Sequence, residues 1–207
     1  MNKEIKTWSE LPVGMLEQIR VADKDIDDED TKILTIAGLL ANKTYREMLD
    51  LPLAETQRLI KNTAFLYEAP KKKKISSVYC LNGTSYRIMK NINDITTAQF
   101  IDYQAIAQES QERISEFLSI FFIPEGCKYN DGNYDRSKVE DDISNYLTAE
   151  EALGIADFFT VHCVRSIKRT LLLLETKMAM LKIFQKSKEA QKVEKMIKEI
   201  RYTYGLV

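Results

Sequence analysis

The residues best suited to binding a metal ion lie between Asp131 and Asp142. Asp131, Asn133 and Asp135 have the spacing of the first three calcium ligands of an EF-hand loop, and Asp142 falls at the twelfth position. The sixth position, where the loop turns sharply on glycine, holds Arg136, and the twelfth lacks the longer bidentate glutamate. The alternative is a tight Asp-Gly turn whose flanking tyrosines pack on a helical body. These departures favour the turn over a calcium site.

The only histidine of the chain, His162, is adjacent to Cys163. Ligands on one face of a helix lie three or four residues apart, so adjacent side chains diverge, and no further Cys or His group completes a tetrahedral zinc site. The sequence also lacks a glycine-rich phosphate loop, a nucleophile elbow and a dinucleotide-binding motif. We therefore assign no catalytic residue, cofactor-binding residue or metal ligand, and we do not expect an enzyme.

Basic residues gather in two segments. The first is the run Lys71, Lys72, Lys73 and Lys74. Four adjacent lysines repel one another, so the run predicts a solvated connector, with contact to phosphate or an acidic protein as the functional alternative. The second segment, residues 185–201, carries six cations against three acids, several of which pair at helical spacing. The net charge of -1 gives no overall field that would attract nucleic acid or an anionic membrane.

Residues 1–70 are expected to contain four short helices that form a small helical subdomain. Ser9 is the candidate N-cap of the first, with Pro12 in its first turn, and Trp8 just outside is expected to pack on that helix or, alternatively, to contact a partner. The acidic block at residues 27–30 predicts the start of the second helix, because negative charge is favoured at a helix N-terminus. Thr44 and Pro52 mark the starts of the third and fourth.

The pair Asn82-Gly83, set between two alternating apolar runs, predicts a β-hairpin. A type I′ turn needs positive φ at both central residues, which asparagine and glycine tolerate. A two-residue loop places Tyr79 opposite Tyr86. Because an isolated hairpin is marginally stable, we expect its aromatic face to pack on the helical segment that follows.

That segment is predicted to be a long amphipathic helix. Thr96 and Gln99 have the pattern of a capping box at its start, and Pro124 ends it. Its apolar face would consist of Phe100, Ile101, Ile114, Phe117, Leu118, Phe121 and Phe122.

A second capping box, Thr148 with Glu151, opens the longest periodic segment of the chain. Its apolar stripe shows heptad-like spacing toward its end, and further apolar residues widen the surface beyond one seam. Such a helix is either deeply packed within its own domain or covers a partner. We predict partner contact through Phe158, Phe159, Leu174, Met178 and Leu181. The stripe lapses after residue 184 and returns as Val193, Ile197, Ile200 and Tyr204.

The fold predicted for these 207 residues is mainly α with one short β-hairpin. Residues 1–70 form the N-terminal helical subdomain, residues 75–207 form a domain of the hairpin and the long helices, and the four lysines connect them. Three cysteines without a short Cys-x-x-Cys spacing fit a reducing compartment. The N-terminus does not resemble a signal peptide, and polar residues interrupt every apolar run well short of a membrane span.

Several short motifs resemble proteins of tailed bacteriophages, especially phages of gut Bacteroidales, including the crAss-like phages. The matching segments are Leu81-Asn82-Gly83 with Tyr86, residues 95–104, residues 122–126 with Tyr129-Asn130, and residues 156–159. The N-terminal part, with Trp8 and Leu51-Pro52-Leu53, is similar to small helical tail-assembly proteins.

This resemblance implies a virion or tail-assembly protein without enzymatic activity, which contacts other phage structural proteins and itself. It would be a virion component of the tail, neck or interior, where it could be internal cargo, and would be in the host cytoplasm during assembly. The alternatives are a tail assembly chaperone that is not retained in the virion, and a nucleic-acid-binding accessory protein. The resemblance transfers no catalytic residue.

Overall fold

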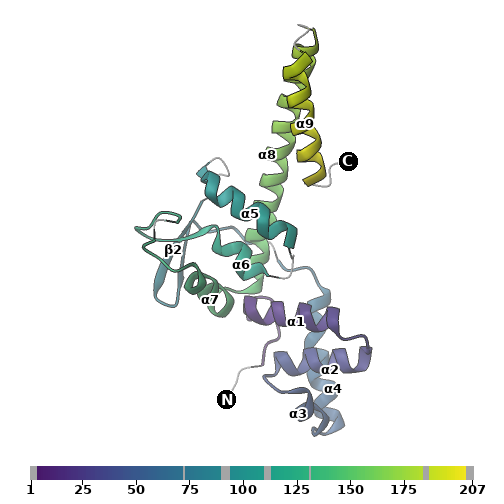
Figure 1. Ribbon diagram of the computed structural model, residues 1–207. Helices are drawn as coiled ribbons and strands as arrows, with labels where there is room; N and C mark the ends of the chain where they lie inside the picture. Colours follow the sequence, from purple (N-terminus) through teal and green to yellow (C-terminus); the bar gives the residue numbers. More distant parts are fainter. Residues whose placement is uncertain are drawn as a thin grey trace. The chain divides into compact units, whose positions relative to one another are not determined.

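The computed structural model describes residues 4–71, 73–89, 94–109, 113–130, 132–183 and 187–203, with backbone alone for residues 107–109, 163–167, 169–170, 179–183 and 187–190. The described chain is mostly helical and contains a small three-stranded antiparallel sheet, which confirms the predicted fold class (Figure 1). Its internal contacts divide it into two units, Met1–Asp157 and Phe158–Val207. This division falls inside a long helix and not at the lysine run, where we had expected the connector between domains.

The N-terminal part consists of helices α1 (Val13–Asp25), α2 (Glu29–Leu40), α3 (Tyr45–Leu49) and α4 (Leu53–Asn62), followed by the 3-10 helix η1 (Thr63–Tyr67). Helix α2 packs against each of the others. A small core between α2, α3 and α4 is built on Ala37, Met48 and Leu59. The four predicted helices are therefore present, and α2 is the element that holds them together.

Two of the predicted helix starts are confirmed by their caps. The Asp28 carboxylate accepts a hydrogen bond from the Thr31 amide at 2.8 Å and caps α2. At the start of α3, Thr44 and Glu47 form a reciprocal capping box. Both signals are local, because the capping residue and the amide it satisfies lie three residues apart.

The predicted cap of α1 was wrong. Helix α1 begins at Val13 after Pro12, and the Ser9 hydroxyl instead lies 3.1 Å from the Thr7 hydroxyl. The reason is a long-range contact: the Val13 amide donates to the carbonyl of Leu147 at 3.1 Å, so a distant loop satisfies the amide that a cap would have served.

The predicted hairpin is confirmed. Strands β1 (Val78–Leu81) and β2 (Thr84–Ile88) pair in antiparallel register with Tyr79 opposite Tyr86. The turn residues Asn82 and Gly83 have φ values of 48° and 75°, as a type I′ turn requires.

We predicted one long helix between Thr96 and Pro124, and this prediction was wrong. Helix α5 (Thr97–Glu109) and helix α6 (Ile114–Ser119) are separate, and Phe122 belongs to a third strand, β3 (Phe122–Pro124), which pairs with β2. The free edge of the hairpin offers this segment backbone hydrogen bonds, and Pro124 is tolerated because β3 is an edge strand. The Phe122 ring contacts both Tyr79 and Tyr86, with ring centroids 5.5 and 6.2 Å apart.

The capping box predicted for the start of α5 is present. The Gln99 amide donates to the Thr96 hydroxyl at 3.2 Å, and the Thr96 amide donates to the Gln99 side-chain oxygen at 2.9 Å. The side-chain nitrogen of Gln99, Nε2, donates to the carbonyl of Ile120 at 2.8 Å, in a fully buried site. One side chain thus starts α5 and fixes the turn that leads from α6 into β3.

Helix α7 (Arg136–Tyr146) packs against α1, α6 and β1. Its approach to α1 is close: a methyl group built on Gly14 would lie 2.2 Å from the Ser144 hydroxyl oxygen. Helices α8 (Ala149–Ile183) and α9 (Ser187–Thr203) complete the chain, and α9 runs back alongside α8 (Figure 1). At the start of α8 the predicted cap is present: the Thr148 hydroxyl accepts from the Glu151 amide at 3.3 Å and donates to the Glu151 carboxylate at 2.8 Å.

Candidate interaction surfaces

The acidic residues that resemble calcium ligands have structural partners. Asp142 is buried and accepts hydrogen bonds from the Tyr86 hydroxyl at 2.5 Å and from the Asn82 side chain at 3.1 Å. Burial and, after it, the bond to Asp142 raise the pKa of Tyr86. Asp135 caps α7 by accepting from the Ser137 amide at 2.9 Å. Asp142 thus fastens the hairpin turn and the sheet to α7.

Asp131 lies outside the described residues. Among the residues that the structure does describe, no group of three or more histidine, cysteine, aspartate or glutamate side chains is placed to hold a metal ion. His162 packs against the ring of Phe158, with ring centroids 4.3 Å apart. The side chain of Cys163 is not described.

The lysine run is partly tied to the protein. Lys73 forms an ion pair of 2.7 Å with Glu150, whose side chain is only 7% exposed. The hydrogen bond that the Lys73 ammonium donates to this carboxylate raises the pKa of Lys73. Lys71 and Lys74 are exposed, and Lys72 lies outside the described residues. Lys73 is also exposed, but its charge is paired with Glu150, so Lys71 and Lys74 are the described lysines of the run better suited to contact a phosphate or an acidic protein.

The returning stripe on α9 packs against α8 of the same chain. Leu171, Val193 and Ile197 are buried in one cluster between the two helices. Leu174, Met178 and Ile200 pack against its edge. An ion pair of 2.8 Å between Arg201 and Glu175 also links the helices. Helices α8 and α9 form a helical hairpin, distinct from the β-hairpin of β1 and β2, and we call the contact between the two helices the hairpin seam.

The seam changes the interpretation of the predicted contact residues. Leu174 and Met178 face α9, Phe159 is fully buried, and Phe158 is half-buried with its ring edge-on to Phe159 at 5.3 Å. The side chain of Leu181 is not described. A partner cannot reach Phe159 without moving other parts of this chain, and charging Leu174 would open the seam.

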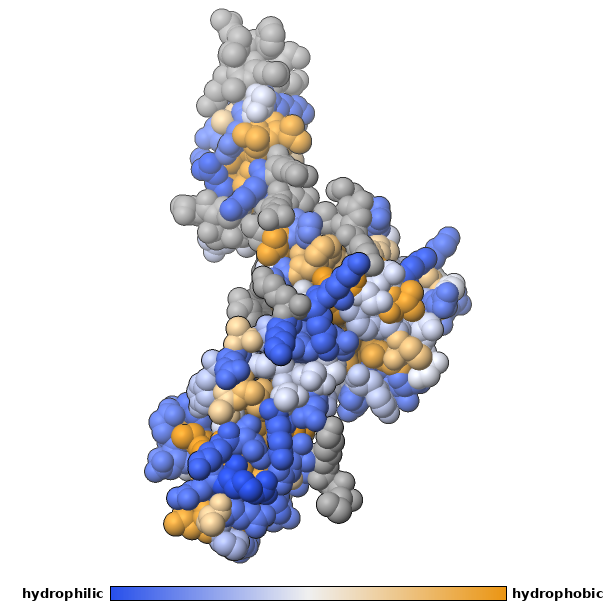
Figure 2. Space-filling model, turned by 180° about the vertical axis from the view of Figure 1, so that it is seen from behind, coloured by the Kyte–Doolittle hydropathy of each residue, from blue (hydrophilic) through white to orange (hydrophobic). Residues whose placement is uncertain are grey.

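The apolar surface that α8 exposes lies on its other side. Leu172 and Leu173 are 64% and 72% exposed, whereas their neighbours Leu171 and Leu174 face the seam. Successive helical residues are about 100° apart, so a run of four leucines cannot all face one partner helix. We call these two residues the exposed leucine pair. Figure 2 shows apolar surface among charged residues on the described part of this hairpin.

The exposure of this pair follows from the sequence once the apolar stripe of α8 is assigned to the side that packs on another helix. Both leucines belong to the run Leu171 to Leu174, which we had expected to widen the apolar surface, but the sequence alone did not separate the two that are exposed from the two that face the seam.

The charges of α9 are largely paired along the helix. Lys198 lies 3.3 Å from Glu194 and Lys195 lies 3.8 Å from Glu199. Both are pairs of residues four apart on exposed helix surface, where such pairs contribute about 0.3–0.5 kcal/mol. These pairs reduce the cationic surface that α9 could offer to nucleic acid.

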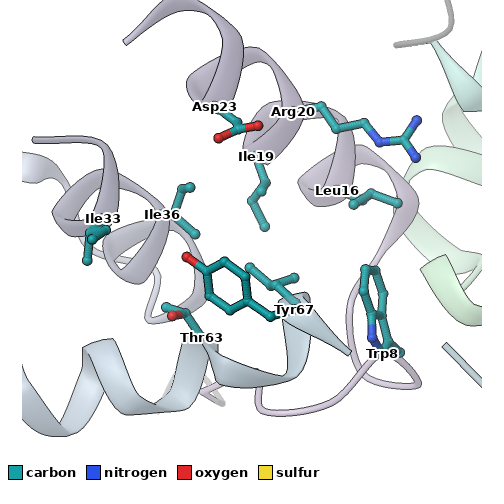
Figure 3. A pocket seen from close by; sticks show the side chains of 10 residues that line it. Trp8, Leu16, Ile19, Arg20, Asp23, Ile33, Ile36, Thr63 and Tyr67 are labelled. Atoms are coloured by element: carbon teal, nitrogen blue, oxygen red, sulfur yellow. The ribbon is translucent and has the colours of Figure 1, made fainter. Parts of the chain in front are cut away.

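A cleft of about 190 Å³ opens between α1, α2 and η1 (Figure 3). Its walls are mostly aliphatic and aromatic side chains, with a few polar ones at its edge. They are Trp8, Leu16, Ile19, Arg20, Asp23, Ile33, Ile36, Thr63, Leu66 and Tyr67. We call it the α1–α2 groove.

Trp8 is held against the helical body at the edge of this groove. Its indole N–H donates to the carbonyl of Glu68 at 2.9 Å, and its ring meets that of Phe65 edge-on at 5.6 Å. Trp8 therefore packs on η1, whereas we had expected it to pack on α1.

Comparison of the chain with protein-family models, with curated proteins and with solved structures gives no match. Across the described part of the chain, no helix combines the length and the apolar content that crossing a lipid bilayer demands.

Proposed function

We propose that the protein is a non-enzymatic bacteriophage structural or morphogenesis protein that acts through protein–protein contacts, as a virion component of the tail, neck or interior. The phage assignment rests on the sequence motifs described above. The contact-based mechanism rests on one observation, the exposed leucine pair on α8 beside an already filled seam.

The size of the hairpin core supports this mechanism. Among the residues of the second unit, Phe158–Val207, whose side chains the structure describes, the seam holds three buried residues, with three more at its edge. Helical hairpins this small are marginal by themselves and are commonly completed by association. Leu172 and Leu173 supply apolar area on the side that the seam leaves open, which is where an added helix would enlarge the core.

The proposed first partner is a second copy of the chain. Two hairpins joined through their exposed leucine pairs would form a bundle in which each α8 is covered on two sides. Burying a leucine side chain contributes about 1.5–3 kcal/mol, so a symmetric contact that buries four leucines supplies a useful part of an association energy. Other phage structural proteins with an apolar helix stripe could bind the same face.

The experiment that tests the phage role is quantitative mass spectrometry of purified particles and of infected cells, for the phage that encodes this chain. We expect the protein in mature particles at a fixed number of copies. Its presence during infection but not in particles would support an assembly chaperone instead. Its absence from particles, together with unchanged particle assembly when its gene is deleted, would contradict a morphogenesis role.

A further inference from the structure

The α1–α2 groove is apolar along its floor and open to solvent. Leu16 and Ile19 of α1 are buried beneath it, and Ile33 and Ile36 of α2 are only half-buried. Tyr67 at the end of η1 also lines the groove, and this residue is 83% exposed. In Figure 3 these side chains converge from three elements on one space. The groove therefore presents apolar surface that the described chain leaves uncovered.

The volume of the groove identifies the class of occupant. Pockets for cofactors and drug-sized ligands occupy about 300–1,000 Å³. A cleft of about 190 Å³ is smaller than these and matches one or two apolar side chains of another protein. Such side chains act as anchors when they fill a pocket at the centre of an interface.

One end of the groove is acidic. Two charged residues of α1 line the groove: Asp23, whose side chain is 69% exposed, and Arg20, whose side chain extends away from Asp23 (Figure 3). Between residues 23 and 32 the chain carries six carboxylates against two lysines. Lys32 lies 3.5 Å from Asp23 and 3.1 Å from Glu29, while Asp25, Asp27 and Asp30 are exposed around the turn between α1 and α2. This end favours a positively charged partner.

We propose that the α1–α2 groove binds a basic segment of another protein, which places one or two bulky apolar side chains against Trp8, Ile36 and Tyr67 and directs its lysine or arginine side chains toward Asp23. The apolar anchors supply affinity and the carboxylates supply orientation. This contact is separate from the hairpin seam and from the exposed leucine pair, so it does not depend on the proposed self-association.

The chain contains its own reporter for this site. Trp8 is the only tryptophan, it lines the groove, and its indole N–H and ring are already fixed by Glu68 and Phe65. An occupant that displaces water from the groove will change its fluorescence.

The test is a titration of the full-length protein, followed by Trp8 emission, with three synthetic peptides of about twelve residues that share the same leucine positions. Their remaining residues are lysine in the first, glutamate in the second and serine in the third. We expect saturable binding of the lysine peptide, at least about tenfold tighter than binding of the glutamate peptide and weaker at high salt.

Two groove variants and two matched controls locate the binding. Tyr67→Ala should weaken the lysine peptide at least about fivefold, as loss of an aromatic contact does, and Asp23→Asn about twofold to fivefold. The controls Tyr202→Ala, at a tyrosine that is 85% exposed on α9, and Asp141→Asn, at an exposed aspartate on α7, should leave binding unchanged. All four side chains are exposed, so the fold should survive each change.

Three results would overturn the proposal. The first is no saturable change in Trp8 emission with the lysine peptide. The second is equal affinity for the three peptides, which would remove the acidic end from the recognition. The third is an equal effect of the groove variants and their controls, which would place the binding elsewhere on the chain.

Discussion

Replacing Tyr86 by phenylalanine should destabilise the unit that contains the sheet. The ring would still pack against Phe122, but the hydroxyl that donates to the buried Asp142 at 2.5 Å would be lost. Asp142 would keep its bond from the Asn82 side chain. Removing one partner of a buried group costs about 1–3 kcal/mol, with the higher values for charged groups, so we expect a loss of about 2 kcal/mol.

Tyr86→Ala should cost more, because it also leaves a cavity. Truncating a buried aromatic typically costs about 3–5 kcal/mol. Tyr79→Phe is the matched control, since Tyr79 lies directly opposite in the hairpin and its hydroxyl accepts one bond, from the Ser76 amide at 3.2 Å, at an exposed site. For this control we expect a loss under about 1 kcal/mol.

Urea unfolding followed by the fluorescence of Trp8 is the suitable assay, because Trp8 and Tyr86 belong to the same unit. The transition midpoint should fall in the order Tyr79→Phe, Tyr86→Phe, Tyr86→Ala, with an unchanged dependence on urea concentration. A Tyr86→Phe protein as stable as the wild type would refute the role assigned to the bond with Asp142. Equal losses for the two phenylalanine variants would refute it as well.

Three further predictions use the same unfolding assay. Gly14→Ala should cost about 1–3 kcal/mol because its methyl group collides with α7, whereas Gly154→Ala, with nothing within 4 Å, should be neutral or stabilising. Gly83→Val should cost about 1–3 kcal/mol, because a β-branched residue resists a φ of 75°. A hydrogen-bonded ion pair with Arg58 lowers the pKa of Glu4 from about 4.5 to about 2. The stability that this pair contributes is fully present above pH 4.5 and should be lost as the pH falls toward 2. This loss of stability should be smaller in Glu4→Gln. A Gly14→Ala protein no less stable than Gly154→Ala, an unshifted midpoint for Gly83→Val, or identical acid profiles for Glu4→Gln and the wild type would each contradict the corresponding expectation.

Local signals in the sequence were sufficient for the hairpin and for most helix starts. Asn82 and Gly83 specify their turn through the φ values that they tolerate, and Thr96 with Gln99 forms a cap within one helical turn. Such features depend on residues a few positions apart, so the turn and the cap form without help from distant parts of the fold.

Features decided by distant contacts were not predictable in the same way. Phe122 fits an amphipathic helix by its spacing, but β3 forms because β2 offers a free edge far back in the sequence. Ser9 had the right type for a cap, yet the carbonyl of Leu147 serves the first amide of α1. Short apolar runs do not distinguish a buried helix from a buried strand by periodicity alone.

The candidate surfaces also differ in how much of each could be predicted from local sequence signals. The heptad-like stripe on α8 could be read from the sequence, but its partner, the stripe on α9, becomes visible only when the two helices are placed side by side. Once Leu174 is seen in the seam, Leu173 is left exposed and becomes the residue to test. The α1–α2 groove had no sequence signal, because three separate elements build it.

Sedimentation equilibrium of the purified chain tests the central claim most directly, using Leu173→Glu and a matched control, Leu53→Glu. The two leucines are 72% and 73% exposed, one on α8 and the other on α4. We predict that the wild type and Leu53→Glu form oligomers at high micromolar concentration, whereas Leu173→Glu is a monomer with unchanged helix content. A wild type that stays monomeric at that concentration, or equal dissociation of both variants, would contradict this prediction.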